Sequence, residues 1–181
     1  MKRDQALEAV KSRVKNDRLV KHMLAVEAIM RALARRLGED EEAWAIAGLV
    51  HDLDYDETAN DPERHGILGA SYLREMGVDE KIAHAVESHA GHRNRESQMD
   101  KALYAIDPLS GLLVAAALMH PAKKLAPVDA DFVLNRFKEK RFAAGANREQ
   151  IKTCEEMGIS LAEFVDLGLK AMQAVSDDLG L

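Results

Sequence analysis

Histidine and aspartate side chains that can bind metal ions recur through the first 107 residues of the chain. They are His22, the adjacent pair His51 and Asp52 in GLVHDLDYD, His65, His89 and Asp107. Imidazole nitrogens and carboxylate oxygens together suit iron, manganese, cobalt, nickel or zinc better than calcium. Asp107 lies in the most apolar stretch, ALYAIDPLSGLLVAAALMH, where an ionised carboxylate is costly unless a cation lies beside it. The sequence therefore predicts two divalent metal ions bound by these side chains.

Apolar stripes at helical spacing predict that these side chains point inward. His22 lies beside the apolar stripe that includes Val26 and Ile29, and three of the other candidates follow the same pattern on their own helices. Neighbouring residues on a helix point about 100° apart. His51 and Asp52 can therefore both reach one ion only near a helix end, which is where the chain turns from apolar to polar.

The composition favours an all-α fold of about eight or nine helices in one domain, residues 1–181. Aromatic residues are 4% of the chain, alanine and leucine are plentiful, and no alternating strand pattern of useful length is present. Capping residues and terminal glycines predict helices over residues 4–15, 17–37, 41–53, 62–76, 80–90, 98–119, 128–140, 147–157 and 160–178. Asp61 and Pro62 are expected to start the fourth of these helices, and Pro108 to kink or break the sixth.

Charge and cysteine content limit the partners and the compartment. A net charge of −6 argues against a nucleic-acid duplex as partner. Cys154 is the single cysteine, which fits a reducing compartment. The N-terminus has no apolar signal segment, and the apolar run LLVAAALM is too short to span a bilayer. We therefore expect a cytoplasmic protein without a membrane partner.

The order of the candidate ligands resembles that of the HD-domain superfamily of metal-dependent phosphohydrolases. The likeness is to the subset with the extended H…HD…H…H…D pattern, and it covers residues 17–120 as a core. The C-terminal extension, residues 121–181, resembles the end of small stand-alone proteins predicted to be HD hydrolases. The resemblance implies an HD-type helical bundle with two metal sites, and it is specific for fold and metal but not for substrate.

The resemblance also implies roles for individual residues. His22, His51, Asp52 and Asp107 would hold one metal ion, and Asp52 would bridge to a second ion bound by His65 and His89. A water activated by the ions, iron or manganese before cobalt, nickel or zinc, would attack phosphorus, which makes Asp52 and His51 the catalytic residues. The implied substrate is a small phosphorylated molecule such as a nucleotide, and a homodimer is compatible with the pattern.

The chain departs from many HD enzymes because no lysine follows the HD pair. The acidic residues Asp54 and Asp56 stand there instead, as acceptors for ligand imidazoles or as a solvated turn, with the turn slightly favoured. We expect Arg93, Lys124 and His84 to contact substrate. The basic segment 136–148 has two open interpretations, a lid over the site or a contact between subunits.

Two other functions remain open at the level of sequence. A few proteins with the HD fold and the same six ligands are oxygenases with a mixed-valence di-iron centre. A third possibility is a non-catalytic module that senses nucleotides. Activity with redox-silent metals would exclude the oxygenase, and tight nucleotide binding without turnover would indicate the sensing module.

Overall fold

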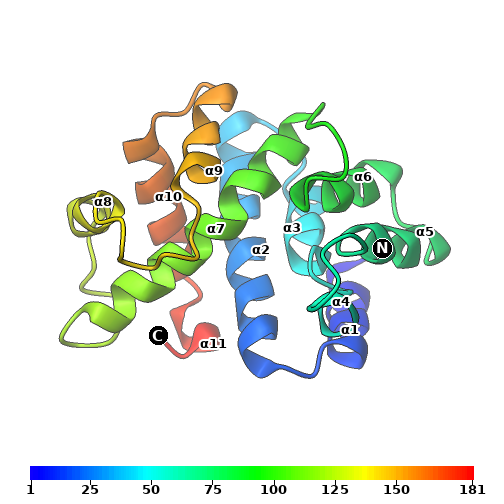
Figure 1. Cartoon of the computed structure of the whole chain (residues 1–181), viewed down its shortest axis with the longest axis horizontal. Coiled ribbons are helices and arrows are strands. Elements are labelled where there is room, and N and C mark those ends of the chain that lie inside the picture. The colour runs from blue at the N-terminus through cyan, green and yellow to red at the C-terminus, as the bar shows by residue number, and fades with distance from the viewer.

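The computed structural model describes residues 1–181 and contains helices and connecting turns without strands (Figure 1). The elements are α1 (Arg3–Arg13), α2 (Asp17–Leu37), α3 (Glu41–Val50), α4 (Tyr55–Thr58), α5 (Ile67–Glu75), α6 (Glu80–His89), α7 (Gln98–Met119), α8 (Ala130–Phe137), α9 (Arg148–Lys152), the 3₁₀ helix η1 (Thr153–Met157), α10 (Leu161–Gln173) and α11 (Ser176–Leu179). The predicted all-α fold is confirmed. The structure contains more helices than predicted. The additional ones include α4 and α11, which have four residues each.

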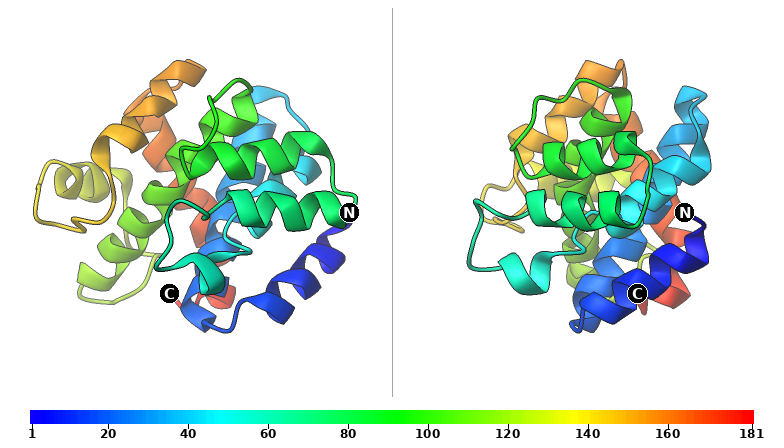
Figure 2. Two further views of the ribbon diagram at one scale, coloured as in Figure 1. Left: turned by 45° about the vertical axis from the view of Figure 1, so that its right-hand side comes forward. Right: turned by 90° about the vertical axis from the view of Figure 1, so that its right-hand side faces the viewer.

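The two longest helices, α2 and α7, form the centre of the molecule. Helix α2 packs against α3, α7 and α10, and α7 packs against α6, α8, α9 and η1. Helices α3 to α6 lie on one side of this central pair and α8 to α10 on the other, as Figures 1 and 2 show from different directions. Side chains from either half can therefore meet between α2 and α7.

Helix α7 is the apolar centre of the core. By length and composition it could cross a membrane, but 56% of its most apolar 18-residue window is buried inside the protein. Leu103, Ile106, Leu109 and Leu113 are fully buried there. The apolar character of α7 thus has a structural explanation in the packing of a helical domain.

Most predicted helix starts are confirmed by side-chain caps. The side chains that accept a hydrogen bond from the first turn belong to Asn16, Asp40, Asp79, Ser97, Asp129, Asn147 and Ser160. Gly38 ends α2 with φ 75°, a conformation that costs glycine little. The predicted helix 160–178 is divided in two, α10 and α11.

Pro108 does not end α7, so of the two predicted effects, a kink or a break, the break is wrong. A proline inside a helix has no N–H for the carbonyl four residues earlier, which here belongs to Tyr104. The Gln150 side chain donates to this carbonyl with an Nε2–O distance of 2.8 Å. A residue from α9 thus supplies the hydrogen bond that Pro108 cannot make, and α7 continues for another eleven residues to Met119.

The start of α5 also differs from the prediction. Residues 61–66 form turns, and α5 begins at Ile67 after Gly66, whose φ is 77°. The Asp54 carboxylate accepts from the backbone N–H of Gly66 at 2.8 Å and of Gly69 at 2.9 Å. The helix is therefore capped by a carboxylate from a preceding segment and not by Asp61.

Candidate metal centre

The six predicted ligands come together between the central helices. His22 lies on α2, His51 and Asp52 directly follow α3, His65 precedes α5, His89 is the last residue of α6, and Asp107 lies on α7. The ring centroid of His51 lies 5.0 Å from that of His22 and 5.1 Å from that of His89. The structure thus places five elements around one polar cluster, which we call the metal cluster.

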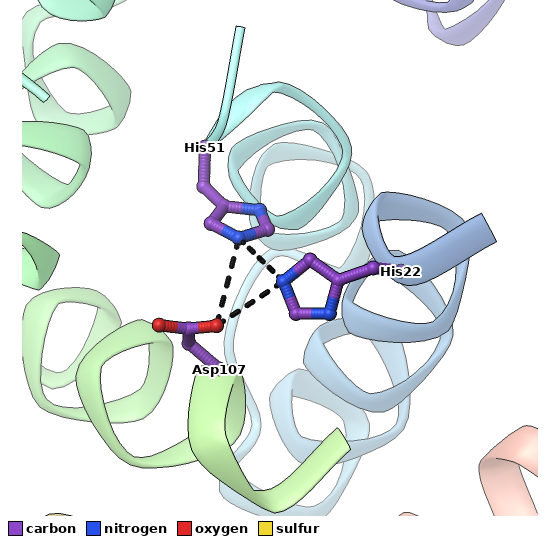
Figure 3. A group of neighbouring side chains, drawn as sticks. All are labelled: His22, His51 and Asp107. Atoms are coloured by element: carbon purple, nitrogen blue, oxygen red, sulfur yellow. Dashed lines mark hydrogen bonds and ion pairs between the residues drawn. The ribbon is translucent and has the colours of Figure 1, made fainter. Parts of the chain in front are cut away.

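One half of the metal cluster is formed by His22, His51 and Asp107 (Figure 3). The Nε2 atom of His22 lies 3.1 Å from Nε2 of His51 and 3.1 Å from Oδ1 of Asp107. Nε2 of His51 lies 3.9 Å from the same Asp107 oxygen. Three electron-pair donors at such distances repel one another unless a proton or a metal ion lies among them.

The Asp52 carboxylate divides the metal cluster in two. Its Oδ2 atom lies 3.7 Å from Nε2 of His22 and 3.5 Å from Nε2 of His51. Its Oδ1 atom lies 3.4 Å from Nε2 of His65 and 3.6 Å from Nε2 of His89. Each oxygen therefore faces its own pair of imidazoles, as expected of a carboxylate that bridges two sites.

Backbone carbonyls orient the two most buried imidazoles. Nδ1 of His51 donates to the carbonyl of Gly48 at 2.8 Å, and Nδ1 of His89 donates to the carbonyl of Val86 at 2.5 Å. Each bond places the ring proton on Nδ1 and leaves Nε2 unprotonated toward the cluster.

Side chains do the same for the other two imidazoles. Ser110 donates its hydroxyl proton to the carbonyl of Asp107, so its oxygen accepts from Nδ1 of His22 at 2.9 Å. Nδ1 of His65 donates to Oδ1 of Asp54 at 3.1 Å. All four Nε2 atoms are thus presented as ligands, the arrangement typical of metal-binding histidines.

Asp54 is a buried acceptor and not part of a solvated turn. Its side chain has no exposed surface, and it serves both His65 and the start of α5. A Cβ atom at Gly69 would lie 3.3 Å from the Asp54 carboxyl carbon, so glycine leaves the room for this approach. Asp56 lies in a solvated turn, as predicted: its side chain is exposed and accepts only from the backbone N–H of Lys15.

The charges of the cluster fit a cation. Burial lowers the pKa of His51 to about 4, which keeps this imidazole neutral near neutral pH. Burial opposes ionisation of Asp52, and positive charge on the surrounding imidazoles lowers the pKa of its carboxyl below the ordinary value. With the imidazoles neutral, a bound cation would supply that positive charge. Nε2 of His89 is buried without any hydrogen-bond partner. An unsatisfied nitrogen beside an ionised carboxylate is the environment that a divalent ion satisfies.

Two cavities open onto the metal cluster. One, of about 440 Å³, is lined by Asn16, Arg18 and Tyr55 together with four of the ligands. His22 and Asp107 have 24% and 32% of their side-chain surface exposed, so Asp107 lies at the mouth of the site and not in the apolar interior. Arg18 and Tyr55 were not among the predicted substrate contacts. The position of Arg18 one helical turn before His22 is the sequence signal that could have identified it.

The second cavity, of about 400 Å³, shows what the segment 136–148 does. Ala143, Gly145 and Ala146 line it together with His22 and Asp107. Arg148 donates to the backbone carbonyls of Ala143 and Ala146, both at 2.7 Å, and so holds the segment in place. The segment is thus a wall of the cavity.

None of the three predicted substrate-binding residues lines either cavity. Arg93 pairs with the Glu87 carboxylate at 2.9 Å, and His84 contacts Asp100 at 3.1 Å. Lys124 is exposed in the turn after α7. Arg93 and His84 are thus paired with the carboxylates of Glu87 and Asp100, whereas Arg18 lines the cavity over the metal cluster.

The chain belongs to the HD domain family, which matches residues 19–126. An uncharacterized protein from Methanocaldococcus jannaschii is 31% identical over 161 residues, which cover 84% of this chain and 92% of that protein. Most of the chain, 84% of its length, therefore has a counterpart in at least one relative of similar size.

Other relatives are longer and carry other names. Ribonuclease Y from Sulfurovum sp. is 28% identical over 131 residues, 71% of this chain and 26% of that enzyme. A tRNA (cytidine(56)-2'-O)-methyltransferase from Picrophilus torridus is 31% identical over 88 residues, 49% of this chain and 25% of that enzyme. The chain spans only about a quarter of these two proteins, as the same alignments give.

Proposed function

We propose that this protein is a metal-dependent phosphohydrolase that cleaves a phosphate ester or nucleotide with metal-activated water. The observation that carries the proposal is the position of Asp52, whose two carboxylate oxygens each face a separate pair of unprotonated imidazole nitrogens. The donor set fits two divalent ions of intermediate hardness, with iron or manganese foremost.

The ligands divide into two groups in this proposal. His22, His51 and Asp107 would hold one ion, and His65 and His89 the other, with Asp52 shared between them. The bound ions would lower the pKa of a coordinated water and stabilise negative charge on a phosphoryl oxygen.

The chain's own residues supply orientation and access. Ser110 and Asp54 hold the imidazoles of His22 and His65 at Nδ1, so that both rings keep Nε2 toward the cluster. The partly exposed His22 and Asp107 leave the centre open to the two cavities, where a substrate can approach. In the reaction, the oxygen of water bonds to phosphorus, the ester P–O bond breaks, and the departing alkoxide takes up a proton.

The test is hydrolysis by the purified full chain after loading with manganese, iron or cobalt. The panel contains p-nitrophenyl phosphate, nucleoside monophosphates and a single-stranded RNA oligonucleotide, the last because several relatives are named ribonuclease Y. We expect phosphate release or RNA cleavage that requires metal and is lost in Asp52→Asn.

Two results would contradict the proposal. One is the absence of turnover on the whole panel although elemental analysis shows two bound ions. The other is oxygen consumption that depends on iron and is absent with redox-silent metals, which would identify the oxygenase chemistry.

A further inference from the structure

Arg18 differs from nearly all other arginines of the chain because its guanidinium has no partner. Eleven of the thirteen arginines face a carboxylate, a carbonyl or an aromatic ring, and Arg141 is the other exception. The single hydrogen bond of Arg18 runs from its backbone N–H to the side chain of Asn16. Its charge is therefore available to a ligand.

Arg18 lines two cavities that meet at His22. The first is the polar cavity over the metal cluster, which also contains Asp52, His65 and Asp107. The second is a groove of about 380 Å³ that shares Arg18 and His22 with the first. A ligand that binds beside Arg18 can thus reach the cluster at one end and the groove at the other.

The groove is aliphatic, and its rim is basic. We name it the aliphatic groove; its apolar walls are Ala25, Gly111, Val114, Leu118, Leu179 and Leu181. Leu118 is 53% exposed, so burying it under a ligand would remove apolar surface from water. Lys21 stands at the rim beside Arg18 and also makes no ion pair. No phenylalanine, tyrosine or tryptophan lines the groove, so apart from the His22 imidazole it has no ring on which a nucleic-acid base could stack.

We propose that the substrate is a small phosphomonoester whose phosphate binds Arg18 and whose organic part is an aliphatic group in the aliphatic groove. The proposal rests on the proposed function, because it places the phosphate beside the same ligands. A guanidinium presents two parallel N–H groups to phosphate oxygens, and a monoester dianion matches the two cations Arg18 and Lys21. A polynucleotide is disfavoured, since the net charge of the chain is −6.

Binding of phosphonates tests this directly, because their C–P bond is not cleaved. The probes are methyl-, butyl- and hexylphosphonate, titrated calorimetrically into the manganese-loaded full chain. Affinity should rise by about fourfold for each added methylene, as expected for a buried CH₂. The variant Arg18→Ala should weaken binding of all three by about tenfold or more, the effect of one lost charge-assisted hydrogen bond.

Two matched controls make the test specific. Arg141→Ala removes the other arginine without a partner, away from both cavities, and should leave all three affinities unchanged. Leu118→Asn should flatten the dependence on chain length and leave methylphosphonate binding unchanged. Met119→Asn, at an equally exposed neighbour (60%) that does not line the groove, should preserve the dependence.

Several outcomes would overturn the inference: equal affinity for the three phosphonates, no binding of any of them, or wild-type affinity in Arg18→Ala. Tighter binding of single-stranded RNA than of hexylphosphonate would assign the cavities to a polynucleotide. A dimer in sedimentation that Leu118→Asn abolishes and Met119→Asn preserves would make the groove a contact between copies of this chain. If the phosphonates bind as expected but no phosphate ester is hydrolysed, the proposed function fails and the binding site stands.

Discussion

Helix α6 carries two histidines and α7 carries two aspartates, and the two histidine–aspartate combinations that they form have different surroundings. His84 and Asp100 meet near the start of α7, whereas His89 and Asp107 belong to the metal cluster. Asp100 accepts at one oxygen from the backbone N–H groups of Glu96 and Ser97, at 3.0 and 2.9 Å, and lies 3.1 Å from His84. We call this group the capping cluster.

The metal cluster lacks such donors. Its imidazoles direct their N–H groups outward, and Nε2 of His89 has no partner within the chain. In the capping cluster, two backbone N–H groups donate to one oxygen of the carboxylate, while its other oxygen is buried without a partner. In the metal cluster, no backbone N–H group donates to the Asp52 carboxylate, and a proton or a cation among the side chains would balance its charge. Histidine and aspartate side chains alone therefore do not make a metal site. Whether such a group can bind a metal ion depends on the direction in which its N–H groups point.

The largest expected difference between the two clusters is in metal content. Asp52→Asn leaves one neutral oxygen where two charged ones faced both pairs of imidazoles, so bound metal should fall from about two ions per chain to nearly none, and metal-dependent hydrolysis by about 100-fold or more. Elemental analysis after gel filtration measures this loss. Asp100→Asn, the matched change in the capping cluster, should keep both ions, and equal metal loss in the two variants would erase the distinction.

Removal of metal should lower the melting temperature through the metal cluster and not through the capping cluster. A chelator should lower the melting temperature of the metal-loaded chain by about 5–10 °C. The reason is that a metal ion bound only to the folded state adds about 3 kcal/mol to the free energy of unfolding when its free concentration is about 100 times Kd. Differential scanning calorimetry measures the shift. Asp100→Asn should show the full shift and Asp52→Asn none. A chelator-insensitive wild-type chain would show that the six ligands do not need an ion.

The residues that orient the imidazoles should have intermediate effects. Asp54→Asn removes the charged acceptor of His65 and should weaken metal binding by about 10-fold to 100-fold. Ser110→Ala removes the neutral acceptor of His22 and should weaken it by less, within about tenfold. Competition with a fluorescent chelator measures both affinities. Unchanged affinity in Asp54→Asn would mean that this carboxylate serves only as the cap of α5.

The smallest effect is expected from the capping cluster itself. Asp100→Ala leaves the N–H groups of Glu96 and Ser97 without an acceptor and should reduce the free energy of unfolding by about 1–2 kcal/mol. Urea denaturation at fixed metal concentration measures the change. Metal affinity should stay the same; a parallel drop would show that the two clusters are coupled through α6 and α7.

The sequence predicted which histidines and aspartates come together in space, but it did not predict that Arg18 lines the cavity over them. The ligands His22 and His89 are visible because each follows an apolar stripe, which requires no knowledge of other helices. Arg93 was selected because it follows His89 closely in the chain, yet its charge is occupied by Glu87. Nearness in sequence is a poor guide to a surface arginine, because long side chains take the carboxylate that tertiary packing brings within reach.

Local interactions between residues close in the chain account for the helical class, for the helix starts capped by residues such as Asp40 and Ser97, and for the inward faces. Other features depend on contacts between distant segments. The Asp54 carboxylate caps α5, and the Gln150 side chain donates the hydrogen bond that Pro108 cannot make inside α7. The guanidinium of Arg18 has no partner. These hydrogen bonds join segments that are distant in the sequence. The residues next to each polar group in the chain therefore do not reveal which partner will satisfy it.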